Sequence, residues 1–191
     1  MRNEHCLCDD LPQIDNETLL TVIMHHRESW KTTNTARLAG LCLKKSEIYL
    51  RGLKKKPLNT ASLIKSDHTP LFLTLNERSK VLSQELLSTL KPPFQLIVPD
   101  GNWRQASKVG KREAALNAAV WVKLPPGPTS QYQLRHEHLE EGLATLEAIA
   151  RAYGIIESKQ IQIQLEEAFL KMVSRTLLTR PPLPNELNSK A

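Results

Sequence analysis

The chain has 191 residues, of which 40% are hydrophobic and 24% charged, so it can bury a sizeable core and is not disordered. Its three cysteines do not suit a disulfide framework, and its polar first residues and short apolar runs argue against a secretory signal or a membrane span. The formal net charge of +6 favours polyanionic partners. We expect one domain over residues 1–180, a flexible tail over residues 181–191, and a cytosolic setting without membrane contact.

Hydrophobic periodicity predicts an alternation of short apolar strands and helices. In chain order, these are strand 19–25, helix 33–43, strand 47–50, strand 71–75 after the breaker Pro70, helix 79–90 capped by Ser79, strand 94–98, helix 102–116 capped by Asn102, strand 119–124, and helices 139–153 and 158–178. This alternation favours an α/β domain with a mainly parallel sheet. Ligands bind beyond the carboxyl ends of such strands, which directs attention to loops 25–35, 75–79, 99–103 and 124–135.

Basic residues concentrate in two stretches of the chain. The first holds Lys31, Arg37, Lys44, Lys45, Arg51, Lys54, Lys55 and Lys56 against Glu47, and the second holds Arg104, Lys108, Lys111, Arg112 and Lys123 against Glu113. A patchy charge of this kind is what a phosphate-binding face needs. A solvated surface of mixed sign explains the charge alone equally well.

The turn Pro99–Trp103 combines several features of a binding site. Asp100 follows a predicted strand, and Gly101 permits a sharp turn or a close ligand approach. Asn102 would cap the next helix, whose first N–H groups and positive dipole end can hold a carboxylate. On these residues alone, an ordinary turn or helix cap is the simpler interpretation. Trp103 would either line a pocket or belong to the core.

Other polar groups are weaker signals by themselves. Tyr132 and Arg135 follow a rigid proline loop. Tyr132 offers an aromatic face with a hydroxyl, and Arg135 offers a guanidinium that can bind carboxylate or phosphate. His25 and His26 at a strand end are most simply solvated. Cys6 and Cys8 lack the second pair that a structural zinc site needs, so we expect no bound metal.

Five short segments, taken together and in order, resemble the DTW-domain family of tRNA-uridine aminocarboxypropyltransferases. They are Cys6-Leu7-Cys8, His25 with Asn34–Leu38, Asp100–Ala106, Tyr132–Arg135 and Leu143–Ala148. In one departure, Asn102 stands where the family motif Asp-x-Thr-Trp has threonine, but asparagine also caps helices, so we expect the turn to keep its form. In another, the Cys-x-x-Cys that many members carry before Cys-x-Cys is absent, so we expect no four-thiolate zinc site.

The resemblance implies a SPOUT-like α/β fold, with helices on both faces of a mainly parallel sheet and a C-terminal trefoil knot. It further implies that S-adenosyl-L-methionine (SAM) donates its 3-amino-3-carboxypropyl group to N3 of a uridine in tRNA and leaves as methylthioadenosine. Two alternatives stay open, a SPOUT-class RNA methyltransferase and a non-catalytic RNA-binding protein on the same fold. The particular uridine and the oligomeric state also stay open.

The same resemblance suggests roles for individual residues. Asp100 would be catalytic and accept the N3 proton of uridine. The residues expected to bind SAM are Asn34, Gly101, Trp103, Leu124, Tyr132, Arg135, Thr145 and Ala148. Within that set, Trp103 would border the transferred chain, and Arg135 or Asn34 would hold its carboxylate or contact RNA phosphate. The residues expected to bind RNA are Arg37, Lys54, Lys55, Lys56, Arg104, Lys108, Lys111 and Arg112.

Overall fold

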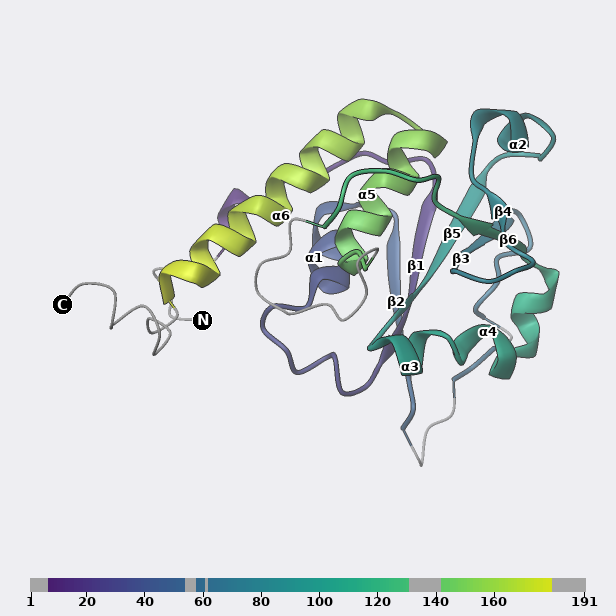
Figure 1. Ribbon diagram of the computed structural model, residues 1–191, viewed down its shortest axis with the longest axis horizontal. Helices are drawn as coiled ribbons and strands as arrows, with labels where there is room; N and C mark the ends of the chain where they lie inside the picture. The colour runs from purple at the N-terminus through teal and green to yellow at the C-terminus, as the bar shows by residue number, and fades with distance from the viewer. Residues whose placement is uncertain (1–6, 54–57, 61, 131–141, 180–191) are drawn as a thin grey trace.

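The computed structural model describes residues 7–53, 58–60, 62–130 and 142–179 (Figure 1). Its strands are β1 (Leu19–His25), β2 (Ser46–Arg51), β3 (Thr69–Leu73), β4 (Lys80–Val81), β5 (Phe94–Asp100) and β6 (Val120–Lys123). Its helices are α1 (Thr35–Cys42), α2 (Gln84–Ser88), α3 (Trp103–Ala106), α4 (Val109–Arg112), α5 (Thr145–Ile156) and α6 (Lys159–Thr179), with short 3-10 turns η2 (Cys8–Asp10) and η3 (Ala114–Ala118). None of the helices within these ranges is long and apolar enough to cross a membrane.

The six strands form one sheet in the order β2-β1-β5-β3-β6-β4, and every neighbouring pair is parallel. This confirms the α/β class and the parallel sheet expected from the alternation of elements. Because all strands run the same way, their carboxyl ends meet at one edge. The loops that follow β1, β3, β5 and β6 therefore all leave the sheet at that edge, which we call the carboxyl edge.

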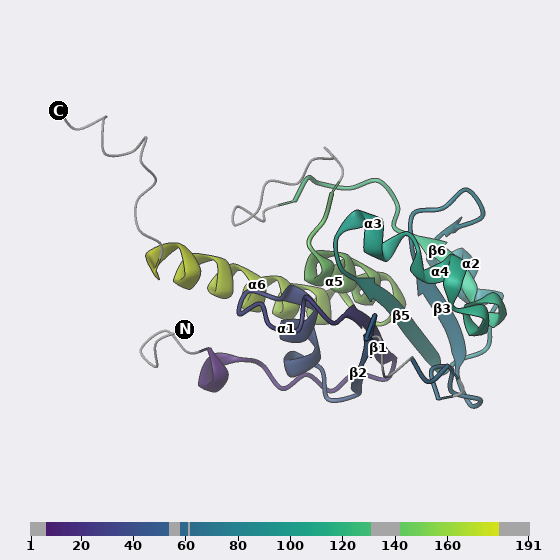
Figure 2. The same ribbon diagram turned by 90° about the horizontal axis from the view of Figure 1, so that it is seen from below.

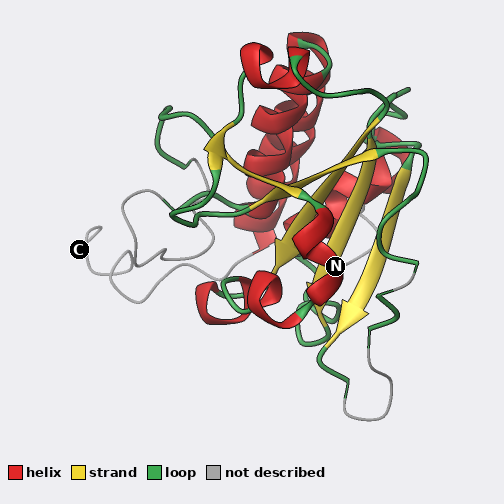
Figure 3. Cartoon of the chain, turned by 90° about the vertical axis from the view of Figure 1, so that its right-hand side faces the viewer, coloured by secondary structure: helices red, strands yellow, loops and turns green. Residues whose placement is uncertain are grey.

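Alternate strand residues point to opposite faces, so the sheet separates two cores. Val22 and Met24 belong to the larger core, which also takes in apolar residues of α1, α5 and α6. Ile23 belongs to the smaller core, with Leu63, Phe72, Ile97, Val109, Leu116 and Trp121. Figure 2 shows α1, α5 and α6 grouped beside the sheet, and Figure 3 shows helices on both sides of it. Helices thus cover both faces, as expected.

The predicted helix 79–90 is wrong in its first half. Lys80 and Val81 form the short edge strand β4, which pairs with the end of β6. The helix begins only after Ser83, whose side-chain oxygen accepts from the Leu86 N–H at 3.2 Å. Ser83 and not Ser79 is therefore the cap. The open edge of β6 offers backbone hydrogen-bond groups to Lys80 and Val81, and the hydrophobic pattern of residues 79–90 contains no sign of this pairing.

The predicted helix 102–116 is broken into α3, α4 and η3 by contacts with the sheet. The Glu113 carboxylate accepts from the Arg51 side chain at 2.5 Å, and the backbone of Glu113 is extended, which ends α4. The Trp121 indole donates to the Leu116 carbonyl at 2.9 Å. These tertiary contacts outweigh the helical periodicity, which is a weak preference.

Further boundaries also differ from expectation: α1 begins at Thr35 and not at residue 33, and β3 ends at Leu73 and not at residue 75. Pro70 lies inside β3 and does not precede it. At Pro70, β3 pairs with β5 on one side only, because its pairing with β6 starts at Leu71. The N–H that proline lacks would point to the side without a strand, so no ladder bond is lost. In the last part of the chain, α5 begins at Thr145, whereas a helix was predicted from residue 139.

The helix α5 crosses the sheet from the carboxyl edge to the opposite edge. At its far end, the Glu157 carboxylate accepts from the backbone N–H of Glu17 at 3.1 Å and of Thr18 at 2.6 Å. The buried Tyr153 hydroxyl donates to the Thr18 carbonyl at 2.8 Å, and burial raises the pKa of Tyr153 well above its usual value. These bonds fix α5 against the start of β1, which in turn places Thr145 at the carboxyl edge.

Candidate active site

Asp100 is the last residue of β5 and lies in register with Met24 of β1. It therefore belongs to the strand, whereas the sequence placed it just beyond the strand. Its side chain is only 6% exposed although it stands at the carboxyl edge of the sheet. A carboxylate buried to this degree requires hydrogen-bond donors around it.

Asn34 supplies one of these donors. It caps α1 through its side-chain oxygen, which accepts from the Arg37 N–H at 2.7 Å. Its amide nitrogen donates to Asp100 Oδ2 at 2.8 Å. One buried side chain thus both begins a helix and orients the carboxylate.

Thr145 supplies a second donor from another helix. As the first residue of α5, it donates its hydroxyl to Asp100 Oδ1 at 2.7 Å. Both of these donors are neutral side chains. The N-terminal ends of α1 and α5, where dipoles favour negative charge, lie beside the carboxylate. We call Asn34, Asp100 and Thr145 the carboxylate triad of the site.

The turn after Asp100 keeps the form expected of an asparagine cap. Asn102 Oδ1 accepts from the Gln105 N–H at 2.9 Å, and Gln105 Oε1 accepts from the Asn102 N–H at 2.9 Å. This is a capping box, and it holds the first turn of α3. Gly101 does not adopt a positive φ. A Cβ atom there would lie 2.9 Å from Gln105 Oε1, so glycine makes room for the capping box.

Trp103 begins α3 and is 40% exposed, so the possibility that it belongs to the core is excluded. Its indole is available to a ligand at the carboxyl edge. Of the residues expected to bind SAM, Asn34 and Thr145 bond to Asp100, Gly101 follows it in the chain, and Trp103 begins the next helix.

The remaining members of that set are placed differently. Leu124 and Ala148 are half-buried and pack against the larger core. Leu124 follows β6 at the carboxyl edge, and Ala148 lies one turn into α5. The expected residues Tyr132 and Arg135 lie outside the described part of the chain.

The start of α5 is tied to the loop after β6 by Glu147. This buried carboxylate accepts from the Ala144 N–H at 2.8 Å and from the Ser130 hydroxyl at 2.6 Å. Arg151 donates to the Pro128 carbonyl at 2.6 Å. The two elements that flank residues 131–141 are therefore held together close to Thr145. Sequence reasoning missed this link, because a glutamate in the first helical turn is also common without such a partner.

His25 ends β1 beside the site, since a Cβ atom on Gly101 would lie 3.4 Å from His25 Cβ. Its Nδ1 accepts from the Arg27 N–H at 3.2 Å. Burial, followed by the charges of His26, Arg27 and Arg51, lowers the pKa of His25. The ring is therefore predominantly neutral near pH 7, with its proton on Nε2.

The residues expected to bind RNA fall into two groups. Arg104, Lys108, Lys111 and Arg112 are exposed on or beside α3 and α4. Arg37 is exposed in the first turn of α1. Lys54, Lys55 and Lys56 lie outside the described residues.

Two lysines of the first basic stretch lie elsewhere. Lys44 and Lys45 precede β2 at the edge opposite Asp100, and they pair with Asp15 at 2.8 Å and Glu17 at 3.2 Å. The basic stretch is thus divided between two edges of the sheet.

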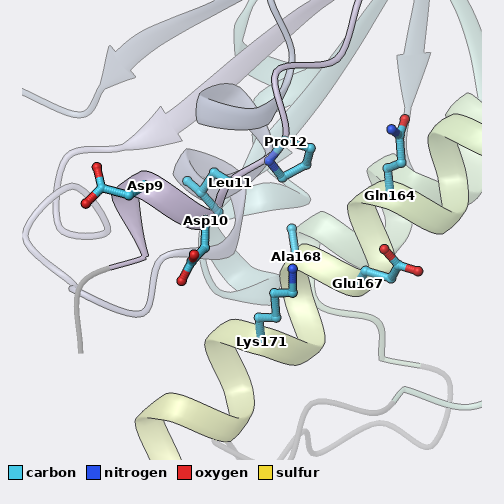
Figure 4. Close-up of a pocket in the computed structure, with 8 residues that line it drawn as sticks. All are labelled: Asp9, Asp10, Leu11, Pro12, Gln164, Glu167, Ala168 and Lys171. Atoms are coloured by element: carbon cyan, nitrogen blue, oxygen red, sulfur yellow. The ribbon is translucent and has the colours of Figure 1, made fainter. Parts of the chain in front are cut away.

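The depressions in the surface of the described residues include the following two. One of about 640 Å³ lies at the carboxyl edge and is lined by Leu75, Asn76, Glu77, Lys111 and Lys123. The other, of about 230 Å³, lies between residues 9–12 and α6, and none of the expected site residues lines it (Figure 4). Within the described ranges, no group of three His, Cys, Asp or Glu side chains is arranged to hold a metal ion.

A family model described as the DTW domain matches residues 1–177. The chain is 28% identical over 158 residues to tRNA-uridine aminocarboxypropyltransferase 2 of Macaca fascicularis. This alignment covers 80% of the chain and 53% of that protein. The protein of the same name from Drosophila melanogaster is 27% identical over 158 residues, or 81% of this chain and 63% of that protein.

The tRNA-uridine aminocarboxypropyltransferase A of Arabidopsis thaliana is 28% identical over an alignment of 221 positions, which covers 98% of this chain and 84% of that protein. The chain therefore spans about half the length of the Macaca relative and most of the Arabidopsis one. No solved structure matches it significantly.

Proposed function

The chain belongs to the DTW-domain family, and on that premise we propose that it transfers the 3-amino-3-carboxypropyl group of SAM to N3 of a uridine in tRNA. The names of its relatives support both the reaction and the substrate. The observation that carries the proposal is the carboxylate triad. It joins Asn34, Asp100 and Thr145, which come from three of the separate segments by which the sequence resembles the family.

Asp100 accepts the N3 proton of uridine in this proposal. N3 is a poor nucleophile until that proton is lost, and a positioned carboxylate is a suitable acceptor. Asn34 and Thr145 hold the two carboxylate oxygens so that the acceptor need not reorganise during the reaction. As the N3–carbon bond forms, the carbon–sulfur bond breaks, and its electron pair stays on sulfur in methylthioadenosine.

The site suits such a donor molecule. When bound, SAM supplies an electrophilic carbon next to a sulfonium, which is already activated for departure. The polar groups of Asn34 and Thr145 and the exposed Trp103 indole lie at the carboxyl edge, where α/β folds bind ligands. Trp103 borders the transferred chain, whereas Leu124, Tyr132 and Ala148 contribute to the donor pocket. Arg135 or Asn34 holds the carboxylate of the donor.

The proposal includes a SPOUT-like arrangement with a C-terminal trefoil knot. The strand order is compatible with it, since β5 lies between β1 and β3 and the strands therefore do not follow their order in the chain. A knot further requires a later part of the chain to pass through a loop formed by earlier residues.

The first test of the proposal is product analysis. Incubating the chain with SAM and bulk tRNA, followed by mass spectrometry of the nucleosides, is expected to give an aminocarboxypropylated uridine and an equal amount of methylthioadenosine. Formation of S-adenosylhomocysteine with a methylated nucleoside would instead identify a methyltransferase. Binding of tRNA without any product would identify a non-catalytic RNA-binding protein.

The second test is substitution of Asp100. Asp100→Ala and Asp100→Asn remove the proton acceptor, so we expect both variants to lose tRNA modification while they still bind SAM. Calorimetry with SAM and circular dichroism establish that the site and the fold persist. Asp15→Asn is the matched control, because Asp15 lies on the opposite edge in an exposed ion pair. Turnover of Asp100→Asn at the rate of the unmodified chain would exclude Asp100 as the base.

A further inference from the structure

One large side chain near the site has almost no contact with the rest of the protein. Trp30 is 81% exposed, whereas Trp103 is 40% exposed and Trp121 only 9%. Tryptophan is usually highly buried because its ring is large and mostly apolar. Such exposure contributes little to folding and leaves the indole accessible to a partner.

The loop that carries Trp30 is held in a fixed form. The Arg37 guanidinium donates to the carbonyls of Ser29 and Lys31, each at 3.3 Å, and so bridges the residues on either side of Trp30. Lys31 Nζ donates to the buried Glu28 carboxylate at 2.6 Å. The Ser29 hydroxyl donates to the His26 carbonyl at 2.6 Å. A ring on a pre-formed loop loses little conformational entropy when it binds a partner.

The same loop is connected to the carboxylate triad. Arg37, which holds the carbonyls around Trp30, donates its backbone N–H to Asn34 Oδ1, and Asn34 donates to Asp100. The loop also follows β1 directly, so it leaves the sheet at the carboxyl edge. The backbone on either side of Trp30 is thus held by Arg37, which also bonds to Asn34 of the carboxylate triad.

The charge around Trp30 favours a polyanion. Arg27, Lys31 and Arg37 lie within seven residues of Trp30 and are exposed. The acidic residue of this loop, Glu28, is buried beneath Lys31. An aromatic ring surrounded by cations is the arrangement that binds unpaired nucleotides, whose bases stack while their phosphates pair with Lys and Arg.

We propose that Trp30 stacks on an unpaired base of the RNA substrate next to the modified uridine. The proposal rests on the proposed function, since N3 lies on the pairing edge of uridine and is reached only when that uridine is unpaired or turned out of its helix. Trp30 thereby selects single-stranded or loop nucleotides. It takes no part in the chemical step.

The test compares Trp30→Ala and Trp30→Phe with the unmodified chain. Stacking on an aromatic residue is worth about 1–3 kcal/mol per base, so Trp30→Ala should raise the Kd for tRNA about 5- to 150-fold. Trp30→Phe should recover most of this loss, because it keeps an aromatic face. The slope of log Kd against log salt should stay unchanged, since no cation is removed. Leu41→Ala, at another exposed apolar residue, is the control.

A second measurement does not depend on the Kd. Titration with a single-stranded uridine-containing RNA should quench the tryptophan fluorescence of the unmodified chain, and the part due to Trp30 should vanish in Trp30→Phe. Equal quenching in both proteins, or a Kd for tRNA unchanged in Trp30→Ala, would overturn the proposal. So would a change in oligomeric state of Trp30→Ala without a change in RNA binding, because the partner would then be a second copy.

The proposal and the function on which it rests are read from different measurements. RNA binding and quenching report on Trp30, whereas methylthioadenosine release reports on catalysis. Weaker RNA binding by Trp30→Ala supports the stacking role even if no methylthioadenosine forms. Normal release with unchanged RNA binding overturns the stacking role and leaves the function standing.

Discussion

At the scale of single residues, Asn34 has two separable roles. Its oxygen caps α1, and its amide nitrogen donates to the buried Asp100 carboxylate. Serine keeps an oxygen that can cap α1, but it has no amide group to donate to Asp100. Alanine removes both the cap and the donor. The two substitutions therefore separate helix capping from orientation of the base.

We expect Asn34→Ser and Asn34→Ala to lose tRNA modification to a similar extent. A hydrogen bond to a charged group contributes about 1.5–3 kcal/mol, and both variants should lose that stability. Asn34→Ala should lose about 1 kcal/mol more, because the cap is also removed. Urea denaturation measures the stability, and methylthioadenosine release measures the rate. A fully active Asn34→Ser would show that Asp100 needs no amide donor.

The lowered pKa of His25 gives a second prediction at this scale. The unfolded chain binds a proton at His25 near pH 6.5, whereas the folded chain binds it only at lower pH. The stability that follows from the neutral ring is therefore present above about pH 6.5 and declines as the pH falls through the folded value. Thermal melting from pH 8 to pH 5 should show a smaller decline for His25→Gln than for the unmodified chain. Parallel declines would exclude this role of His25.

At the scale of elements, the capping box of α3 holds the turn that follows Asp100. Asn102→Thr installs the residue that the family motif has here, and threonine also caps helices, so we expect wild-type activity and nearly wild-type stability. Asn102→Ala should weaken the cap by about 1 kcal/mol and reduce turnover, because the start of α3 and Trp103 lose their fixed position. Melting curves and initial rates test both variants. An Asn102→Ala protein with unimpaired turnover would show that the capping box is dispensable.

The same elements show how far the sequence predicts the fold. Residues 19–25 form β1 with the expected bounds, because a continuous apolar run is compatible with a buried parallel strand. Residues 79–90 do not form one helix, since β4 depends on pairing with β6, which lies about forty residues further along the chain. Local periodicity predicts a strand such as β1, which is buried on both faces of the sheet. It does not predict an edge strand such as β4, which forms only because a strand distant in the sequence pairs with it.

The sequence predicted that the three residues of the carboxylate triad lie at one site, but it did not predict the bonds between them. Asp100, Asn34 and Thr145 were all expected at the site from the family resemblance. Their hydrogen bonds span 66 and 45 residues of sequence, so no spacing rule brings them together. Trp30 was missed, because its exposure is a property of the folded loop and not of the sequence pattern.

At the scale of the whole molecule, cations lie at two opposite edges of the sheet. Lys108 and Lys111 lie with α4 at the carboxyl edge, whereas Lys44 and Lys45 precede β2 at the other edge. RNA that reaches Asp100 meets the edge that carries the first pair, so we expect that pair to contact its phosphates. The two pairs carry the same charge and so form a matched comparison.

We expect Lys108→Gln with Lys111→Gln to weaken tRNA binding and to reduce the salt slope of log Kd by about 1–2. Lys44→Gln with Lys45→Gln should change neither quantity, because exposed ion pairs contribute little to stability and this edge faces away from Asp100. Filter binding over a range of salt concentrations measures both. Equal effects of the two double substitutions would mean that charge attracts RNA without a preferred face.

The proposed reaction differs from methylation in the carbon that leaves SAM. The most direct measurement incubates the chain and tRNA with SAM labelled either in the aminocarboxypropyl chain or in the methyl group, and then counts the label in the purified tRNA. We predict that the chain label enters tRNA in the unmodified protein, that it does not enter with Asp100→Asn, and that the methyl label enters in neither case. Entry of the methyl label alone, or equal incorporation of the chain label with Asp100→Asn, would contradict the account.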